Sequence, residues 1–582
     1  MKKRFLGITC CILFFLQAFA QQDIDTSIRA SLHHSSMNKK NIPTVNENLF
    51  LLAKVWGFLK YYHPTIAAGK FNWDQELIAI LPSICNSSAK ERNELLEQWL
   101  NKFGPVSACT SCNDSILVNA KLKPDFSWIN EKNFSKALVQ KLLFIKNNRI
   151  QQEPYYIKVL AADGVNFIQF QHEPLYLNLV FPNDTYGLLS LFRFWNIIEY
   201  WYPYRYGPLK QWDTFLYEFI PKMLRHTNGY DYTICIEQML VALQDGHGYC
   251  RGPLTEEILG KYYMPFTVKL IEHKLLVTSI LKDSLAALSK IKVGDIIESI
   301  DNKSIPTLIQ QISSNLPASN TGSLLHKMSY RLTRSNNKEN NLTVRRNGEL
   351  INIRTQNYIP NIYPPVNLAP PFFSYQKDSA FCMLEEEIGY VNLGKFKRAD
   401  SLALKSFISK AKSLIIDNRQ NQDETNGTGG GDIVAKLILP AENRFVKFTS
   451  AQPKYPGVFT LGNASNMGIT ESANPFKGNI IILINEKTIS VGEFLTMAYQ
   501  KAPTAKTLGT TTAGADGNIA HIMLPGSINT VVTGLGVYYP NGKKTQRTGI
   551  KPDIEVTQTI WGYQQGIDEQ LAKAVDYLKR KQ

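Results

Sequence analysis

The sequence predicts a multidomain protein of mixed α+β structure, and three observations support this. An aromatic helical pattern occurs twice in the first half of the chain. Short alternating strand patterns follow from about residue 262 to 356. Strand and helix patterns then alternate over residues 388–556, which is typical of a mostly parallel sheet covered by helices. At 582 residues the chain is long enough for three or four domains.

The N-terminus has the pattern of a secretory signal peptide. A basic start at residues 2–4 precedes an apolar run over residues 5–15, and Ala-Phe-Ala at residues 18–20 supplies a small-x-small cleavage site. The apolar run is too short for a comfortable membrane span, and no later segment reaches that length. We therefore expect an exported protein, periplasmic or secreted, whose signal peptide is residues 1–20.

The aromatic helical pattern is an internal repeat with the same offset for every matched pair. Its members are Trp56, Pro64, Trp73-Asp74, Leu77 and Pro82, which recur as Trp195, Pro203, Trp212-Asp213, Leu216 and Pro221. Aromatic residues at helical spacing usually belong to a core. We expect two related helical units, and the alternative that their Tyr-rich turns also touch a ligand stays open.

A small β domain is expected next. Its strand patterns are FTVKLIEHKLLVTSIL, GDIIESIDNKSI and NLTVRRNGELINIRT, which begin at residues 266, 294 and 341. The stretch from residue 360 to 371 is rich in proline and predicts a linker before the C-terminal core.

The core contains the most informative residue, Ser490. The expected strands are IGYVNLG, SLIIDNR and NIIILIN, which begin at residues 388, 413 and 479. Ser490 follows the third strand and begins a helical pattern. Active sites of parallel sheets lie beyond the carboxyl ends of the strands, and a helix N-terminus stabilises a developing oxyanion. These features predict a serine nucleophile.

A structural role for Ser490 is the alternative. Ser490 and Glu493 have the S-x-x-E spacing of a capping box, in which the serine accepts from the helix backbone and the glutamate reaches back to it. Helix capping is a common role of serine, so the motif alone does not establish catalysis.

Two loops elsewhere favour catalysis. The helical pattern LVAL ends at Asp245, and His247 follows between Gly246 and Gly248. A lone histidine is more often structural, but flanking glycines allow close approach of other backbone. The second loop, residues 427–431, contains three adjacent glycines directly after a buried strand pattern. It lacks the lysine of a phosphate-binding loop.

Together these residues resemble the tail-specific, or C-terminal processing, serine peptidases, in the branch related to the tricorn core. The matching segments in family order are LVALQDGH (from residue 240), IGYVNLGKF (388), DNR with its glycine-rich loop (417), TISVGEF (488), GTTTAGADGN (509) and GIKPDIEV (549). The resemblance implies a crotonase-like α/β core and a PDZ-like identity for the β domain. PDZ domains capture extended peptides at a sheet edge.

The resemblance also implies the base that activates Ser490. One branch of the family uses a lysine about two dozen residues after the serine, and Ala515 stands at that position here. The tricorn-like branch uses a histidine before the PDZ-like insert, and His247 matches it. Imidazole is well suited to accept a proton near neutral pH. We therefore expect His247 to be the general base.

Further family positions match less closely. A serine precedes the histidine in the tricorn-like branch, whereas this chain has Gly246, and a glutamate of that branch falls at Gln546. Glu493 matches an acidic family position and is expected either to orient its neighbours or to cap the helix. The oxyanion donors are expected to be the N–H of Val491 and that of Gly429 or Gly430, and the choice between the two glycines is open.

The cysteine spacing and the net charge indicate which cofactors and partners to expect. Cys109 and Cys112 form a C-x-x-C pair that indicates a local disulfide or free thiols, because no second pair or histidine cluster accompanies it as zinc requires. The net charge of +15 comes from scattered basic residues without a nucleic-acid-binding stripe. We expect no metal or cofactor, a peptide or protein substrate and no nucleic-acid partner. The scattered charge is expected to be a solvated surface, and attraction to an anionic envelope surface is the alternative that stays open. The sequence also leaves the oligomeric state open.

The function predicted from the sequence is an exported serine endopeptidase acting through an acyl-enzyme. A catalytically weak or inactive peptide- or lipid-binding protein is the alternative, and an esterase or amidase is a second. The expected divisions are residues 1–20 (signal peptide), 21–185 (first helical unit and connection), 186–258 (second helical unit), 259–357 (PDZ-like domain), 358–374 (linker) and 375–582 (peptidase core).

Overall fold

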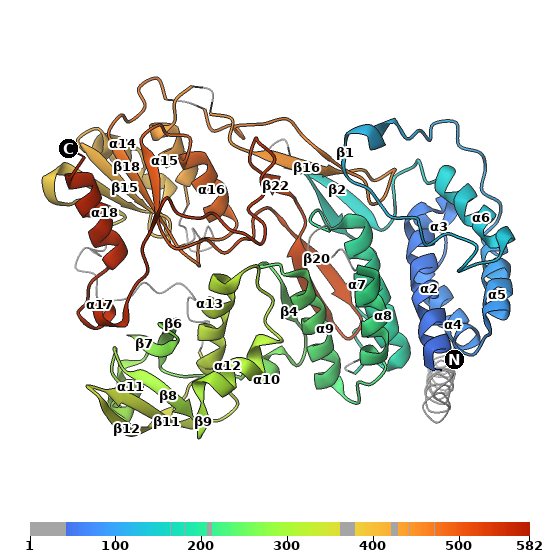
Figure 1. Cartoon of the computed structure of the whole chain (residues 1–582), viewed down its shortest axis with the longest axis horizontal. Helices are drawn as coiled ribbons and strands as arrows, with labels where there is room; N and C mark the ends of the chain where they lie inside the picture. Colours follow the sequence, from blue (N-terminus) through green and yellow to red (C-terminus); the bar gives the residue numbers. More distant parts are fainter. Residues whose placement is uncertain are drawn as a thin grey trace, which may run out of the picture.

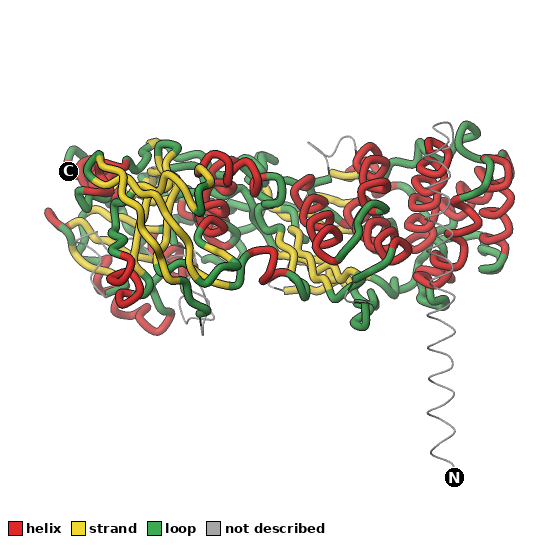
Figure 2. The backbone as a smooth tube through the Cα atoms, turned by 90° about the horizontal axis from the view of Figure 1, so that it is seen from below, coloured by secondary structure: helices red, strands yellow, loops and turns green. Residues whose placement is uncertain are grey.

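The computed structural model describes residues 42–581, apart from 163–164, 180, 206–211, 361–378, 421–428, 442 and 471. The expected signal peptide and most of the proline-rich linker lie outside these residues. The mixed α+β architecture is confirmed. Helices gather at one end of an elongated molecule, the C-terminal core lies at the other end, and the small β domain lies beneath the core (Figure 1). Figure 2 shows the same division as helices at one end and strands toward the other.

The predicted repeat forms two helix pairs built alike. The first pair is α2 (Ile42–Tyr62) with α4 (Trp73–Cys85), and the second is α7 (Asp184–Trp201) with α8 (Trp212–Met223). In the first pair the indole N–H groups of Trp56 and Trp73 each donate to the other residue's carbonyl, at 3.1 and 3.0 Å. Trp195 and Trp212 repeat this exchange at 2.9 and 3.2 Å. Both exchanges satisfy buried indoles, which explains the spacing of the tryptophans.

The two helix pairs also exchange ion pairs across their interface. Lys54 of the first copy lies 2.6 Å from Asp213 of the second, and Arg193 of the second lies 2.6 Å from Asp74 of the first. Each basic residue therefore meets the acidic residue of the other copy.

At Gly57, helix α2 leaves no space for a side chain beside α7. A Cβ added there would lie 1.7 Å from the amide oxygen of Asn196. The Asn196 amide nitrogen in turn donates to Ala53 of α2 at 3.0 Å. Glycine is required here by the neighbouring helix rather than by its own backbone angles.

One hydrophobic core joins both helical units to strands that come from the far end of the sequence. The strands are β20 (Ile519–Leu524) and β21 (Ile528–Thr533), which pair with each other, and β21 also pairs with β4 (Tyr249–Arg251). Ile522, Leu524 and Ile528 are buried in the same cluster as the repeat tryptophans. Figure 1 shows β20 beside α7. The helical units are thus packed onto a sheet whose strand β4 directly follows the histidine loop in the chain.

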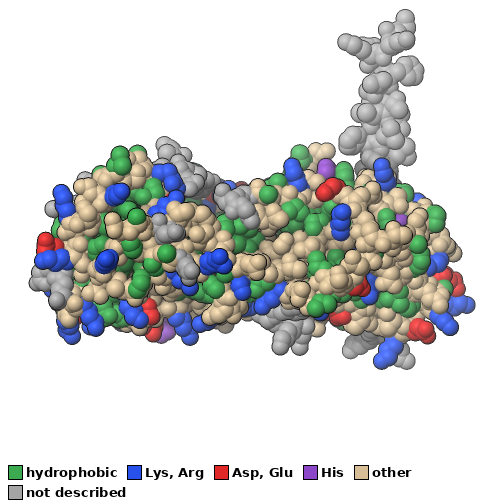
Figure 3. Space-filling model, turned by 90° about the horizontal axis from the view of Figure 1, so that it is seen from above, with side chains coloured by type: hydrophobic (Ala, Val, Ile, Leu, Met, Phe, Trp, Pro, Cys, Tyr) green, Lys and Arg blue, Asp and Glu red, His purple; other side chains and the backbone are tan. Residues whose placement is uncertain are grey.

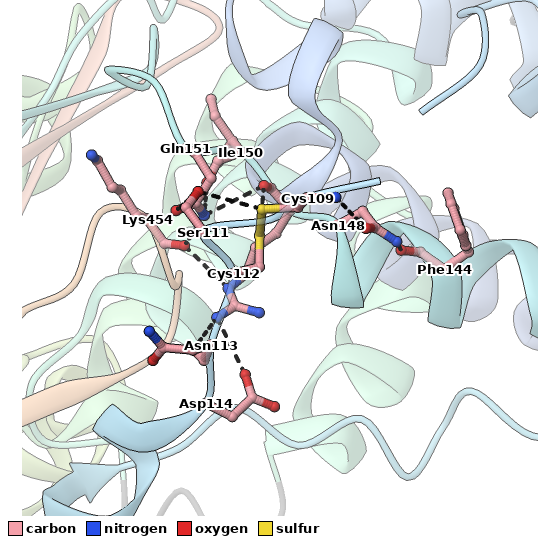
Figure 4. The surroundings of a disulfide bond; sticks show 11 residues. Cys109, Ser111, Cys112, Asn113, Asp114, Phe144, Asn148, Ile150, Gln151 and Lys454 are labelled. Atoms are coloured by element: carbon pink, nitrogen blue, oxygen red, sulfur yellow. Dashed lines mark hydrogen bonds and ion pairs between the residues drawn. A yellow bond between two sulfur atoms is a disulfide. The ribbon is translucent and has the colours of Figure 1, made fainter. Parts of the chain in front are cut away.

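A disulfide closes the C-x-x-C segment between the helices. Cys109 and Cys112 are bonded, so of the two alternatives for this pair the structure has the disulfide. The Cys109 amide donates to Asn148 at 2.7 Å, and the Cys112 sulfur contacts the carbonyl of Arg149 (Figure 4). Arg149 also donates to the carbonyl of Lys454, which ties this segment to the C-terminal half of the chain.

The small β domain has its own core. Its six-stranded sheet has the order β12-β11-β8-β7-β6, with β9 paired to β8. The strands are β6 (Phe266–Ile271), β7 (Lys274–Ile280), β8 (Ile296–Ile300), β9 (Lys303–Ser304), β11 (Glu339–Arg346) and β12 (Glu349–Gln356). The helices are α11 (Asp283–Ser289), α12 (Ile305–Ser313) and α13 (Thr321–Leu332). The predicted strand patterns of this region are confirmed, and α13 packs against the edge strand β6.

The C-terminal core is built on a sheet of order β13-β14-β15-β18-β19-β23, in which only β13 is antiparallel to its neighbour. The strands are β13 (Phe381–Met383), β14 (Ile388–Asn392), β15 (Ser413–Asp417), β18 (Asn479–Ile484), β19 (Ala505–Gly509) and β23 (Ile554–Glu555). The helices are α14 (Ser401–Ile408), α15 (Gly431–Ile438), α16 (Val491–Tyr499), α17 (Ile560–Gln564) and α18 (Glu569–Lys579). The three strands predicted from apolar runs are the buried centre of this sheet.

The remaining elements connect these parts. They are α3 (Pro64–Ala67), α5 (Ala89–Asn101), β1 (Ala120–Leu122), α6 (Lys136–Asn147), β2 (Ile157–Ala162), β3 (Val165–Phe170), α9 (Gly229–Leu243), α10 (Thr255–Leu259), β5 (Tyr262–Tyr263), β10 (Arg334–Ser335), β16 (Lys447–Ala451), β17 (Phe459–Leu461) and β22 (Val537–Tyr538). Strands β1, β17, β16 and β22 form a sheet in that order, which joins the N-terminal region to the core. Among the described helices, none has both the length and the apolar character to cross a membrane.

We expect Gly57→Ala to lower the free energy of unfolding by about 1–3 kcal/mol, because the added methyl group overlaps Asn196 in a fully packed interface. Gly462→Ala is the matched control, since a Cβ at Gly462 meets only ordinary contact at 3.5 Å and should change stability by about 1 kcal/mol or less. Urea unfolding of both variants measures the difference. Equal stability of the two variants would contradict the packing described for α2 and α7.

Candidate active site

Ser490 lies in a strained turn between β18 and α16. Its backbone has φ 54° and ψ −119°, a region that side-chain-bearing residues rarely occupy. The Ser490 N–H donates to the carbonyl of Ala515 at 2.8 Å, which helps to hold this conformation. Such strain clusters at functional sites because the surrounding structure has to enforce it. Ser490 thus stands in a strained strand-to-helix turn after a parallel strand, a position in which serine nucleophiles occur in other folds.

The capping-box alternative is wrong. The Ser490 side chain makes no capping hydrogen bond to α16, and its backbone is not in the extended conformation of an ordinary helix cap. Glu493 does not reach back to Ser490 and instead accepts from Thr512, Gly514 and Ala515. The hydroxyl of Ser490 is therefore not used to begin the helix.

Glu493 fixes the loop that contains Ala515. Its buried carboxylate accepts from the amides of Gly514 and Ala515 at 3.1 and 2.7 Å, and from the hydroxyl of Thr512. Burial raises the pKa of Glu493 to about 7, against the opposing effect of these hydrogen bonds. Of the two roles expected for Glu493, the contacts favour orienting its neighbours.

His247 lies on a loop that the small β domain holds in place. Lys327 of α13 donates to the carbonyls of Gly246, Gly248 and Pro317 at 2.9, 3.2 and 2.6 Å. The Gly246 N–H donates to the hydroxyl of Ser319 at 2.6 Å. All three N–H groups of the Lys327 ammonium have partners, so this lysine is not available to activate a serine. Burial lowers the pKa of Lys327 to about 8.

A chain of hydrogen bonds fixes the tautomer of His247. The hydroxyl of Thr533 donates to the Asp245 carboxylate at 2.8 Å, because an ionised carboxylate only accepts. That hydroxyl has one proton, so at its 2.8 Å contact with His247 Nδ1 it accepts. Nδ1 therefore bears the imidazole proton and Nε2 has the free lone pair. Among the described residues His247 Nε2 is buried without a hydrogen-bond partner, and an imidazole nitrogen in this state is able to accept a proton.

Asp245 is fully buried and accepts four hydrogen bonds. The donors are the His247 amide (3.0 Å), the Thr533 hydroxyl (2.8 Å), the Thr533 amide (2.7 Å) and the Tyr202 hydroxyl (3.2 Å). Burial raises the pKa of Asp245, but the nearby His247 and these hydrogen bonds outweigh it and leave the pKa below its usual range. The carboxylate is therefore ionised near neutral pH.

The surroundings keep His247 neutral. Its side chain is 8% exposed. Burial lowers the pKa of His247 and outweighs the opposing charge of Asp245, and Lys327 lowers it further. An imidazole with a lowered pKa stays unprotonated at pH 7, the form that accepts a proton.

The serine turn and the histidine loop meet at Ala515. Ser490 donates to the Ala515 carbonyl, as described above, and a Cβ added at Gly246 would lie 3.0 Å from the Ala515 Cβ. Residues nearly 250 positions apart thus flank one short loop. No hydrogen bond joins the side chains of Ser490 and His247, both of which the structure describes.

Gln546 lies behind the histidine rather than beside it. Its amide nitrogen is 3.5 Å from the hydroxyl of Tyr202, which donates to Asp245. Gln546 is fully buried, and its amide oxygen has no hydrogen-bond partner among the described residues. It can support Asp245 through Tyr202, but its one side-chain hydrogen bond within the described part of the chain does not go to His247.

The expected oxyanion donors differ in availability. The Gly429 N–H already donates to the carbonyl of Phe396 at 2.9 Å, whereas the Gly430 N–H has no hydrogen-bond acceptor among the residues that the structure describes. Gly430 has φ 101° and begins α15, which packs against α16. Val491 stands in the first turn of α16, where the backbone N–H has no partner within the helix. These contacts favour Val491 and Gly430; residues 427 and 428 of the glycine-rich loop lie outside the described residues.

A metal centre receives no support from the residues that the structure describes. They contain no group of three or more His, Cys, Asp or Glu side chains positioned to hold a metal ion.

Residues 387–556 match the family model of peptidase family S41. These residues are a peptidase family S41 domain. S41 is a family of serine-type peptidases, so the resemblance expected from the motifs is confirmed over this part of the chain. A peptide or protein is accordingly the class of substrate.

Solved structures share the fold over a wider range. Mature CPAF is 15% identical with a TM-score of 0.51, and the match covers 68% of this chain and 97% of CPAF. A CPAF mutant is 14% identical with a TM-score of 0.54, covering 69% and 98%. The photosystem II D1 C-terminal processing protease is 16% identical over 64% of this chain and 93% of that one, with a TM-score of 0.36, too low to support an argument. No curated protein matches the chain.

Sequence reasoning missed the partners of His247. Asp245 stands two residues before it, and that D-x-H spacing is a signal that could have been used. Thr533 and Tyr202 come from a strand and a turn with no recognisable motif, and only the fold brings them to the histidine.

We expect the imidazole of His247 to titrate below its ordinary value of 6.5, because burial disfavours the charged form. Asp245→Asn should lower this pKa further, since the carboxylate is the group that raises it. Nuclear magnetic resonance of isotope-labelled histidine, assigned with His247→Asn, measures both values. Glu94→Gln, on an exposed helix position, is the control. A His247 pKa at or above 6.5 would contradict the described burial.

Proposed function

We propose that the chain is an exported serine endopeptidase in which Ser490 is the nucleophile and His247 the general base. The observation that carries this proposal is the free, buried Nε2 of His247, whose tautomer is fixed by Thr533 and Asp245. The strained Ser490, free of any capping role, supplies the second half of the site. A free serine hydroxyl is inert at neutral pH, so such a base is required.

The reaction balances as an acyl transfer. Ser490 Oγ attacks the carbonyl carbon of a peptide bond while its proton passes to His247 Nε2, and the C–N bond then breaks as that proton passes to the leaving amine. Water hydrolyses the acyl-enzyme by the same proton route. The N–H groups of Val491 and Gly430 are proposed to stabilise the oxyanion, with closure of the Ser490–His247 gap on substrate binding.

The small β domain is proposed to be PDZ-like and to guide the substrate chain toward Ser490. A cavity of about 610 Å³ lies along β6 and α13 and is also lined by Asn485, Glu486 and Lys487. These three residues connect β18 to the Ser490 turn, so the cavity leads from a sheet edge toward the proposed nucleophile. Sheet edges bind extended peptides through main-chain hydrogen bonds. The Leu270 N–H is already bonded to Ser329, which leaves this edge partly occupied.

Export rests on the N-terminal pattern of a basic start, an apolar run and a small-residue cleavage site. The disulfide between Cys109 and Cys112 is consistent with an oxidising compartment. A periplasmic or secreted location is therefore proposed together with the activity.

We expect a fluorophosphonate probe to label the protein at Ser490. Labelling should be absent in Ser490→Ala and slowed about a hundredfold or more in His247→Ala, because general-base catalysis contributes about that factor. Ser406→Ala, at an exposed serine of α14, should label like the wild type. Gel fluorescence and mass spectrometry of the adduct read out the result. A folded protein that takes no label would favour the peptide- or lipid-binding alternative, and a panel of peptide and ester substrates separates a peptidase from an esterase.

We expect Thr533→Val to lower kcat about 10- to 100-fold with little change in KM, because it frees the imidazole to adopt the other tautomer without touching substrate. Thr533→Ser keeps the hydroxyl and should restore most of the activity. Steady-state kinetics on a labelled peptide compares the two variants. If valine and serine were equally active, the Thr533 hydroxyl would have no positioning role.

A further inference from the structure

A second cavity is lined by lysines and shares no lining residue with the proposed active site. It has a volume of about 1000 Å³. Its lining residues are Lys121, Leu122, Pro203, Tyr204, Gln500, Tyr538, Tyr539, Asn541, Gly542, Lys543, Lys544, Thr548, Gly549, Ile550 and Lys551. This set contains four lysines and no aspartate or glutamate. We call it the lysine pocket.

The positive charge of the lysine pocket is not neutralised. None of its four lysines has an ion pair with a carboxylate among the described residues. Lys121 instead lies over the ring of Tyr538, with its nitrogen 5.0 Å from the ring centre. Burial lowers the pKa of Lys544, and the charges of Arg547 and Lys121 lower it further. Like charges gathered without a counter-charge focus an attractive field on anions.

The lysine pocket is built on ordered backbone. Tyr538 and Lys544 form a β-bridge, and the Tyr539 amide donates to the Lys543 carbonyl at 2.8 Å. Lys121 belongs to β1, which joins the same sheet from the N-terminal part of the chain. Charges from segments more than 400 residues apart thus converge on one cavity. Basic side chains are also frequent, and acidic ones sparse, on the face of the molecule shown in Figure 3.

Two connections join the lysine pocket to the proposed active site. Gln500 stands at the C-terminal end of α16, the helix that begins after Ser490, and at 1.5 Å per residue these ends are roughly 15 Å apart. The Ile550 amide donates to the hydroxyl of Thr512 at 2.6 Å, and Thr512 in turn donates to Glu493. The pocket therefore belongs to the same rigid unit as the serine turn but does not overlap it.

We propose that the lysine pocket is an exosite that binds an acidic segment of the peptide substrate. The role of the exosite in positioning a substrate rests on the proposed function. The binding of an acidic peptide to the lysine pocket does not depend on that function. Spread-out ammonium groups suit several carboxylates along an extended chain, and the walls of Leu122, Pro203 and Tyr538 can contact the aliphatic parts of the bound side chains. An extended peptide gains about 3.3 Å per residue, so an acidic segment bound beside Gln500 lies about five residues from the cleaved bond.

The test measures binding on the full chain with Ser490→Ala, so that no cleavage occurs. The probe is fluorescein-labelled hexaglutamate, and its anisotropy is recorded at about 50 mM salt, where the screening length exceeds about 10 Å. We expect Lys543→Gln/Lys544→Gln to weaken binding about tenfold. Lys405→Gln/Lys410→Gln, at exposed positions of α14 and of the turn that follows it, removes the same charge elsewhere and should leave binding within about twofold. Circular dichroism confirms that each variant is folded.

The outcomes separate this proposal from the alternatives. Equal weakening in both double variants would show attraction by net charge alone, and absence of hexaglutamate binding would overturn the exosite. Binding of inorganic pyrophosphate without binding of hexaglutamate would identify a phosphate site instead. If hexaglutamate binds as expected but the wild type does not react with the fluorophosphonate probe, the exosite is supported and the proposed peptidase activity is contradicted.

In an active protein, Lys543→Gln/Lys544→Gln should raise KM about tenfold for a peptide with a distant acidic segment, with kcat unchanged.

Discussion

The buried carboxylate of Asp245 is the interaction on which the site depends. It lies where α9 of the second helical unit ends, and it accepts from Thr533 at the end of β21 and from Tyr202 in the repeat turn. An ionised carboxylate without these donors would cost several kcal/mol in a dry interior. The helical unit, the strand and the histidine loop are therefore positioned by a single requirement, which is to satisfy one charge.

The N-terminal repeat helps to position the hydrogen-bond donors of Asp245. The repeat packs against β20 and β21 in one hydrophobic core, and that core carries both Tyr202 and Thr533 to Asp245. Reciprocal tryptophan bonds and exchanged ion pairs make the two copies a rigid platform. The small β domain holds the other side of the histidine loop through Lys327 and Ser319. His247 is thus held by three parts of the chain that are distant in sequence.

The sequence predicts features that depend on local residue patterns, such as the strands and the repeat. It does not predict contacts between residues that are distant in the chain and meet only on folding. The strands at residues 388, 413 and 479 could be predicted because parallel strands buried on both faces are continuous apolar runs. The repeat could be predicted because its tryptophans recur at one offset. The S-x-x-E pattern at Ser490 misleads, since a local motif does not reveal that Glu493 bonds to a loop twenty residues downstream. Thr533 and the lysine pocket could not be predicted, because only folding brings their residues together.

The departures from the family pattern at Gly246 and Ala515 have one steric explanation. A Cβ at Gly246 would approach the Ala515 Cβ to 3.0 Å and the Ser319 hydroxyl to 3.1 Å, tighter than most carbon contacts. Ala515 is itself fully buried, so a lysine at that position would have to displace the histidine loop. A small residue at each position lets the two loops close on each other. The packing around Ala515 leaves no space for a lysine side chain at that position, and this steric limit is independent of which residue acts as the base.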